Sequence, residues 1–294
     1  MLDPEQLKRD IRSAQEFSTI VKTMKTLAAV NIHQYDQAIE SLHNYHQTLE
    51  LGMQILLLQH PTLLQDLTLT TQPRIGTIVF GSDQGLCGRF NEQMAEFVGR
   101  SPQLIDQTPI ILAVGARIQN ALQEKNLDIE TSVEGPVSVE GIAAMVQAVV
   151  VQVEQWREAH QVGQILLFHH RPSQGDRYFP WQQTVFPLDL AYLQDLSARR
   201  WPSHCRPQVF LDRQPLFSAL FRQHFFVTLY RACVESLISE NMSRLVSMQQ
   251  AQSNITEHLT DLQRQFHQHR QNTITEELLT IISGLEALNH EKED

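Results

Sequence analysis

The two ends of the chain contain almost no proline or glycine. Residues 216–294 have no proline and a single glycine, Gly284, and residues 5–60 have only Gly52. Because proline and glycine disfavour helix interiors more than any other residues, their absence predicts a long helix at each end. At about 1.5 Å per residue, the C-terminal helix would span ~110 Å. A helix of that length must project from a compact domain or pair with another long element.

Other absences restrict the class of protein. No run of about 18 apolar residues occurs, so we expect no transmembrane helix. The acidic opening Met1–Glu5 lacks the basic-then-apolar pattern of a secretory signal, which favours a cytosolic protein. Cys87, Cys205 and Cys233 form no CxxC pair, which indicates reduced, structural thiols. The net charge of −10 argues against a general nucleic-acid binder. It does not exclude a local basic patch.

The N-terminal helix has recognisable start and stop signals. We expect Asp3 as its N-cap, Pro4 in its first turn and Pro61 at its end. Apolar or small residues recur at alternating spacings of three and four, as a left-handed coiled coil requires. This seam comprises Val21, Met24, Ala28, Asn31, Tyr35, Ala38, Leu42, Tyr45, Leu49, Gly52 and Leu56.

The middle of the chain alternates between strand and helix patterns. We expect buried strands at 75–80, 110–114 and 164–168, and an edge strand at 184–186. We expect helices at 90–98, 116–125 and 139–157, and connecting loops over 171–215. This alternation predicts an α/β fold with a parallel or mixed sheet. The predicted domains are an N-terminal coiled-coil helix (1–60), an α/β globular domain (74–200) and a C-terminal coiled-coil helix (213–290).

The C-terminal stripe is interrupted by polar patches, including residues 267–271. Its seam falls into three groups: Ile238, Met242, Leu245 and Met248; Ile255, Leu259, Leu262 and Phe266; Ile274, Leu278, Ile281, Leu285 and Leu288. A partner helix over residues 5–60 is too short to cover all three. The part of the C-terminal helix that the N-terminal helix does not cover therefore needs another apolar surface, such as one formed by surrounding chains.

Motifs in three regions of the chain, the N-terminus, residues 82–91 and the C-terminal helix, follow the same order as in a known family and carry a resemblance to it. The segment 82–91, SDQGLCGRFN, closely resembles the S-D-x-G-L-C-G-x-[FYL]-N signature of the γ subunit of F-type ATP synthases. Residues 239–248 and 270–278 follow its patterns S-E-x-x-x-R-M-x-A-M and R-Q-x-x-I-T-x-E-L. Residues 11–13 and 20–29 look like its N-terminal pattern. The resemblance covers the whole chain.

The resemblance implies a fold and a function. It implies an antiparallel coiled coil of the two terminal helices, joined to a Rossmann-like α/β domain. The coil would lie inside a ring of α and β subunits, and the globular domain would meet the ε subunit and the membrane c-ring. The chain would be peripheral to the cytoplasmic side of the inner membrane. It would carry no ATP site, and would turn to drive the catalytic β subunits through their conformations.

The resemblance also assigns site residues. Arg270, Gln271 and Thr273 match positions that contact the β subunit, and an arginine there could bind a carboxylate through its planar fork. Arg244 and Met24 match positions in a coupling zone where the two helices meet a β-subunit loop. The signature turn comprises Ser82, Asp83, Gly85, Leu86, Cys87 and Gly88.

One departure from the family pattern stands out. The family usually has a basic run after the N-terminal pattern, here residues 20–29, whereas residues 31–37 read NIHQYDQ. The lower positive charge favours a divergent paralogue of the alternate, sodium-type F-ATPases. This sequence does not determine whether protons or sodium ions are coupled, because the ion site lies on other subunits. It also does not determine whether the complex runs towards ATP synthesis or ATP hydrolysis.

Other readings of the same residues are weaker. The turn at 81–88 lacks the lysine of a phosphate-binding Walker loop and does not match GxGxxG. His169 and His170 are adjacent on a strand, so they point to opposite faces and do not suggest a metal site. We expect no catalytic residue, no metal and no cofactor. A coiled-coil scaffold with a globular head and no motor role is the main alternative, and a small-molecule enzyme is a weaker one.

Overall fold

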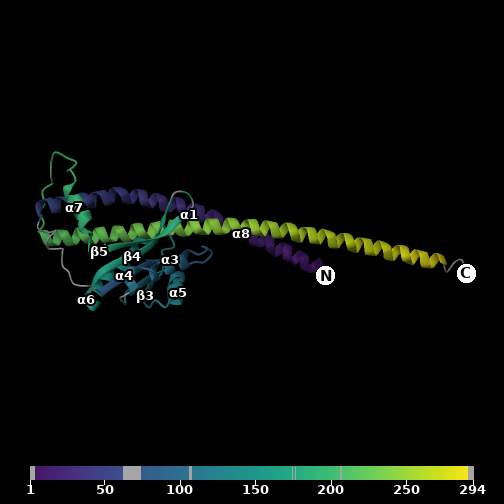
Figure 1. Cartoon of the computed structure of the whole chain (residues 1–294). Coiled ribbons are helices and arrows are strands. Elements are labelled where there is room, and N and C mark those ends of the chain that lie inside the picture. The colour runs from purple at the N-terminus through teal and green to yellow at the C-terminus, as the bar shows by residue number, and fades with distance from the viewer. Residues whose placement is uncertain are drawn as a thin grey trace. The chain divides into compact units, whose positions relative to one another are not determined.

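The computed structural model describes residues 4–61, 74–105, 108–173, 175, 177–205 and 207–290 (Figure 1). The chain divides into two compact units. Residues 1–27 and 246–294 form one, called here the helical unit, and residues 28–245 form the other, called the sheet unit. The expected domain division cuts across these units, because both terminal helices continue from one unit into the other. That division stays a proposal.

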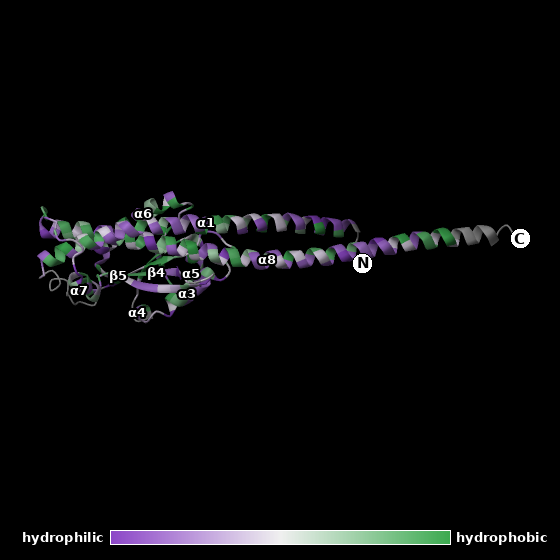
Figure 2. Ribbon diagram, turned by 90° about the horizontal axis from the view of Figure 1, so that it is seen from above, coloured by the Kyte–Doolittle hydropathy of each residue, from purple (hydrophilic) through white to green (hydrophobic). Residues whose placement is uncertain are grey.

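Both long helices are present. Helix α1 covers Pro4–Gln59 and helix α8 covers Arg213–His290. The chain leaves α1 just before Pro61, as predicted, while the expected N-cap Asp3 lies outside the described residues. Apolar and polar residues mix along both helices (Figure 2), and no helix in the described residues is long and apolar enough to cross a membrane.

The predicted seam of α1 is largely buried within the sheet unit. Ala28, Tyr35, Ala38 and Leu56 are all less than a tenth exposed. Tyr45 is the exception: it is 44% exposed, and its hydroxyl only donates to Gln223. In place of Tyr45, the next residue, His46, faces α8, and its ring lies 6.0 Å from that of His224. A straight helix drifts away from a strict 3.5-residue repeat, which explains the shift.

Burial along α8 follows the three groups of its seam. The described side chains of the first two groups are buried or half-buried, whereas Ile274, Leu278 and Ile281 are 47–60% exposed. Leu285 and Leu288 lie outside the described side chains. Within the helical unit, Lys25 of α1 donates to Gln252 of α8 at 3.4 Å. The prediction that part of this helix stays uncovered is confirmed for these residues.

The sheet unit contains a five-stranded mixed sheet in the order β3-β2-β1-β4-β5. The strands are β1 (Arg74–Phe80), β2 (Ile110–Val114), β3 (Ile129–Val133), β4 (Val162–Pro172) and β5 (Tyr178–Phe186). The pairs β1·β2, β1·β4 and β2·β3 are parallel, and β4·β5 is antiparallel. The predictions of a parallel or mixed sheet and of an edge strand at 184–186 are confirmed, and the structure adds that this strand is antiparallel.

Two parts of the sequence reading were wrong. Strand β3 was missed because half-buried and exposed positions alternate in this five-residue edge strand, IETSV, which gives little apolar signal. The segment 171–215, expected to be loops apart from the edge strand at 184–186, contains the end of β4, all of β5, helix α7 (Leu190–Ala198) and the first residues of α8. Asp189 caps α7 by accepting from the Ala191 N–H, and Leu193 and Leu196 bury against α1.

Helices cover both faces of the sheet. Helices α3 (Phe90–Gly99) and α5 (Ala116–Glu124) pack on one face, with the short α4 (Pro102–Ile105) beside them. Helix α6 (Val139–His160) and the first part of α8 pack on the other. Trp156 of α6 and Leu229 of α8 are fully buried there. The sheet unit is therefore three-layered, with α8 built into its core.

Candidate functional site

The signature turn follows β1 and is tightly built. A side chain at Gly81 would place its Cβ 2.2 Å from the Cβ of Ile118, so only glycine lets α5 approach this closely. Leu86 and Gly88 have positive φ angles of 65° and 58°. The resulting left-handed backbone suits glycine at the second position. These constraints explain why this segment reads as a fixed motif and not as a variable loop.

A pair of hydrogen bonds closes the turn onto α3. Asn91 accepts from the Ser82 N–H at 3.0 Å, and its amide donates to the Ser82 hydroxyl at 2.8 Å. Asp83 points the other way. Its two carboxylate oxygens accept from the N–H groups of Ala116 (2.8 Å) and Gly135 (2.6 Å). The turn after β1 is therefore hydrogen-bonded to the segments that follow β2 and β3.

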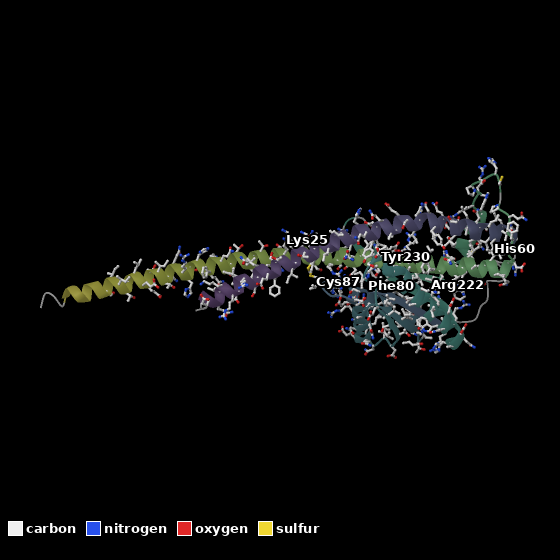
Figure 3. All side chains as sticks on the ribbon, turned by 180° about the vertical axis from the view of Figure 1, so that it is seen from behind. Lys25, His60, Phe80, Cys87, Arg222 and Tyr230 are labelled. Carbon is white, nitrogen blue, oxygen red and sulfur yellow. The ribbon has the colours of Figure 1, made fainter. Side chains whose placement is uncertain are left out.

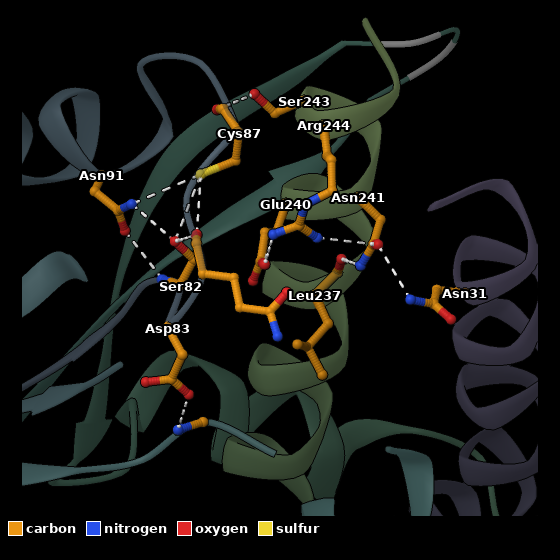
Figure 4. Close-up of polar contacts among 12 residues, drawn as sticks. Asn31, Ser82, Asp83, Cys87, Asn91, Leu237, Glu240, Asn241, Ser243 and Arg244 are labelled. Atoms are coloured by element: carbon orange, nitrogen blue, oxygen red, sulfur yellow. Dashed lines mark hydrogen bonds and ion pairs between the residues drawn. The ribbon is translucent and has the colours of Figure 1, made fainter. Parts of the chain in front are cut away.

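The turn is also fastened to α8 (Figure 4). The Ser243 hydroxyl on α8 donates to the Cys87 carbonyl, and it shares a further hydrogen bond of 2.9 Å with the Tyr178 hydroxyl. Cys87 is 3% exposed, and burial raises the pKa of its thiol. Cys87 and Cys233 are free and buried, as expected of reduced, structural thiols, whereas Cys205 is free but exposed.

Arg244 lies one residue further along α8, in a buried ion pair. Its guanidinium donates to Glu240 at 2.5 Å and to Asn241 at 3.3 Å, and the two charged side chains are each 10% exposed (Figure 4). Burial raises the pKa of Glu240, and the charge of Arg244 opposes that effect. Asn31 of α1 donates to Asn241 at 3.4 Å. The predicted seam residue Asn31 and the predicted site residue Arg244 therefore meet in one polar network.

This network occupies the place where α/β folds usually bind ligands, at the carboxyl ends of parallel strands. The cavity left there is about 140 Å³ and is lined by Asp83, Val114, Glu240 and Arg244, among others. The charged side chains at its wall are already bound to the chain itself. Among the described residues, no group of three or more histidine, cysteine or acidic side chains could hold a metal ion.

The remaining predicted residues lie in the helical unit. Arg270 and Gln271 are exposed, and Thr273 is half-buried with its hydroxyl donating to the His269 carbonyl at 3.1 Å. No other described residue forms an ion pair or a side-chain hydrogen bond with Arg270. Met24 is half-buried. The structure thus places Arg244 next to Ser243, which bonds to the signature turn, and places Arg270, Gln271 and Thr273 within four consecutive residues of α8.

Sequence reasoning missed three residues of the joint between the turn and α8: Glu240, Ser243 and Tyr178. Glu240 and Arg244 are four apart, the spacing at which opposite charges pair on a helix, so their pairing could have been predicted. Tyr178 gave no signal, because its partner is 65 residues away. Near the segment that lacks the basic run, Tyr35 faces inward, while His33, Gln34, Asp36 and Gln37 are exposed.

The fold defines a class: a Rossmann-like α/β unit into which a long C-terminal helix is built, with a second long helix at the N-terminus. A family model described as ATP synthase matches residues 4–288. Proteins named ATP synthase gamma chain match nearly end to end. That of Polynucleobacter necessarius is 24% identical over 98% of this chain and 100% of its own length, and that of Bacteroides thetaiotaomicron is 25% identical over 97% and 99%. The chain belongs to the ATP synthase gamma chain family.

Solved structures share the fold. The central stalk and c-ring structure of Tetrahymena thermophila mitochondrial ATP synthase contains a chain with a TM-score of 0.58 and 22% identity, covering 79% of this chain and 99% of its own. The OSCP/F1/c-ring structure of Euglena gracilis mitochondrial ATP synthase contains one with a TM-score of 0.63 and 18% identity, covering 99% and 96%. The predicted fold of two long terminal helices with an α/β unit is confirmed.

Proposed function

We propose that this chain is the central rotor shaft of an F-type ATP synthase. It couples ion flow through the membrane sector to conformational changes in the catalytic β subunits. The observation that carries the proposal is the end-to-end match to gamma chains, together with a 78-residue helix whose far part exposes apolar side chains. In this proposal residues 1–60 and 213–290 form the shaft and 74–200 the globular domain.

The partners follow from the same proposal. The α and β subunits surround the exposed part of α8, where Ile274, Leu278 and Ile281 lie four and three residues apart and can share one face. The ε subunit and the c-ring bind the globular part. The chain itself carries no catalytic residue, and it is peripheral to the cytoplasmic side of the inner membrane.

The predicted contact residues have different parts in this proposal. Arg270 and Gln271 are exposed, with Thr273 on the next turn, and they contact the β subunit. Met24 lies in the coupling zone. Arg244 differs because its guanidinium is held by Glu240 inside the sheet unit. Its part is to compensate the buried charge of Glu240 on α8, next to Ser243, which bonds α8 to the signature turn so that torque on the helix moves the sheet with it.

Reconstitution tests the proposal. The chain is mixed with its cognate α and β subunits, and the ATPase activity of the purified assembly is compared with that of αβ alone. We expect a stable assembly with higher activity. A stable homodimer that ignores α and β would support the coiled-coil scaffold instead.

A double variant, Arg270→Ala with Gln271→Ala, tests the contact residues. We expect the assembly to form with ATPase activity reduced several-fold, since the lost contacts bias the β subunit in only some of its states. The matched control is Gln263→Ala with Arg264→Ala on the same helix, where Arg264 is 78% exposed and pairs only with Asp261. Equal turnover in the two double variants would remove Arg270 and Gln271 from the mechanism.

The absence of the basic run at residues 31–37 supports a sodium-type F-ATPase. Sequencing the gene of the cognate c subunit and reading its ion-site residues tests this assignment directly.

A further inference from the structure

A second cavity, of about 220 Å³, lies on the opposite side of β4 and β5 from α3 and α5, and α8 forms one wall. A single water molecule needs only about 10–15 Å³, so the space is large enough for a small organic molecule. Its polar lining comes from several elements: His46, His169, Arg171, Gln183, Thr184, Asp189, Tyr192, His224, Thr228, Arg231 and Glu235. All of them belong to the sheet unit.

Two arginines share one carboxylate at this cavity. Arg231 donates through Nε to Glu235 at 2.8 Å, and the Nε of Arg171 lies 3.2 Å from the other carboxylate oxygen. His169 bonds to the same oxygen at 3.0 Å. Burial alone would raise the pKa of Glu235, but the hydrogen bonds from His169 and Arg231 outweigh it and hold the pKa at about 2. Glu235 therefore carries one negative charge opposite two positive ones.

Arg231 hydrogen-bonds to Glu235 through Nε, whereas the Nε of Arg171 is buried without a hydrogen-bond partner, so each guanidinium keeps unused N–H donors. One terminal nitrogen of Arg171 donates to Gln183 at 3.2 Å. No other described residue bonds to the terminal nitrogens of Arg231, whose side chain is 57% exposed. A pair of guanidinium groups with unused N–H donors is the arrangement that best binds phosphate or carboxylate oxygens.

The other groups at the cavity are one further carboxylate and several neutral polar groups. Asp189 contributes that carboxylate to the lining, and it also accepts from the Ala191 N–H at 2.9 Å as the cap of α7, so the unused guanidinium N–H donors, and not a net positive charge, distinguish this cavity. Burial lowers the pKa of His224 to about 4, and it also lowers the pKa of His169, so both rings are neutral at pH 7. Thr228 and Tyr192 add hydroxyl groups to the wall.

From this geometry we propose that the cavity beside Arg171 and Arg231 binds a small-molecule oxyanion, one that carries a phosphate or carboxylate group. The guanidinium groups bind the anionic group, and the hydroxyls and amide of the wall face the rest of the molecule. This site is separate from the predicted β-subunit contacts. It gives the sheet unit a means to sense a soluble metabolite.

Titration with inorganic phosphate and with citrate tests the proposal on the full chain. Binding is followed at the Nε–H signals of ¹⁵N-labelled arginine by NMR, at constant ionic strength, with chloride as the comparison salt. We expect saturable shifts of the Arg171 and Arg231 signals with either oxyanion and none with chloride. Shifts that do not saturate, or that chloride reproduces, would overturn the proposal.

Three variants sharpen the test. Arg231→Gln should weaken binding at least tenfold, while Arg222→Gln should leave it unchanged. Arg222 lies on the same helix (Figure 3), does not line the cavity and pairs with Glu154. Glu235→Gln should tighten binding several-fold, because it leaves both arginines uncompensated. Because Glu235→Gln is expected to raise the affinity where Arg231→Gln lowers it, the proposal can still be tested if Arg231→Gln fails to fold. An affinity for Glu235→Gln equal to or lower than that of the parent chain would refute it.

Discussion

The buried ion pair between Glu240 and Arg244 offers the most discriminating test of how α8 is held. Arg244→Met removes the positive charge and leaves the carboxylate of Glu240 in a site where its side chain is only 10% exposed. Breaking one side of a buried pair costs about 3–5 kcal/mol. We expect about 3 kcal/mol, because both side chains keep some contact with water. Asn241 also loses a hydrogen-bond partner.

The double variant Glu240→Leu with Arg244→Met separates the charge from the packing. Replacing both members of a buried pair by apolar residues of similar volume is often neutral or stabilising. We therefore expect the double variant to lie within about 1 kcal/mol of the parent chain, well above the single variant. Such recovery is the mark of two residues that interact directly.

The measurement is urea unfolding of the full chain, followed by near-ultraviolet circular dichroism, with the slope m compared between variants. Arg222→Met is the control: it removes the same type of residue from the same helix, but its pair with Glu154 is 68% and 48% exposed. Exposed pairs contribute only about 0–1 kcal/mol. If Arg244→Met costs no more than Arg222→Met, Glu240 does not depend on Arg244 to compensate its buried charge.

Three further predictions use the same unfolding assay. Gly81→Ala, which places a Cβ 2.2 Å from that of Ile118, should lose at least about 2 kcal/mol, whereas Gly99→Ala, with no atom within 4 Å, should be near neutral; equal losses would contradict the close approach. Asp83→Ala should lose about 2 kcal/mol because two backbone N–H groups lose their acceptor, and Asp83→Asn should lose less; no loss would contradict the clamp. Burial lowers the pKa of His170 from 6.5 to about 3, so the unfolded chain binds this proton more readily and stability falls below pH 6.5. His170→Phe should therefore gain about 2 kcal/mol relative to the parent between pH 7 and pH 5, and a constant difference across that range would refute the burial argument.

Much of the fold was predictable because its signals are local. The absence of proline and glycine determined both long helices, and their ends agree with the prediction to within a few residues. Strands β1, β2 and β4 are buried on both faces, so their apolar runs are visible in the sequence. Strand β3 and the first half of β5 were not predicted, because an edge strand with one exposed face carries a weaker apolar pattern.

The candidate site was predictable only in part. The signature turn could be recognised as a motif, since its glycines and its Ser82–Asp83 pair serve backbone geometry over a few residues. The sequence alone could not distinguish Arg244 from Arg270. Both lie on the same helix among polar neighbours, and burial depends on which face meets the sheet.

The sequence by itself determined two long helices, an α/β unit and the family, because each depends on periodicity or on short motifs. Only the tertiary structure decided which charges are buried. Glu235 receives its partners from α8 and from β4, and the closest of these in sequence on β4, Arg171, is more than 60 residues away. Electrostatic energy depends on distance in space and on exclusion of water, and neither can be read from position along a chain.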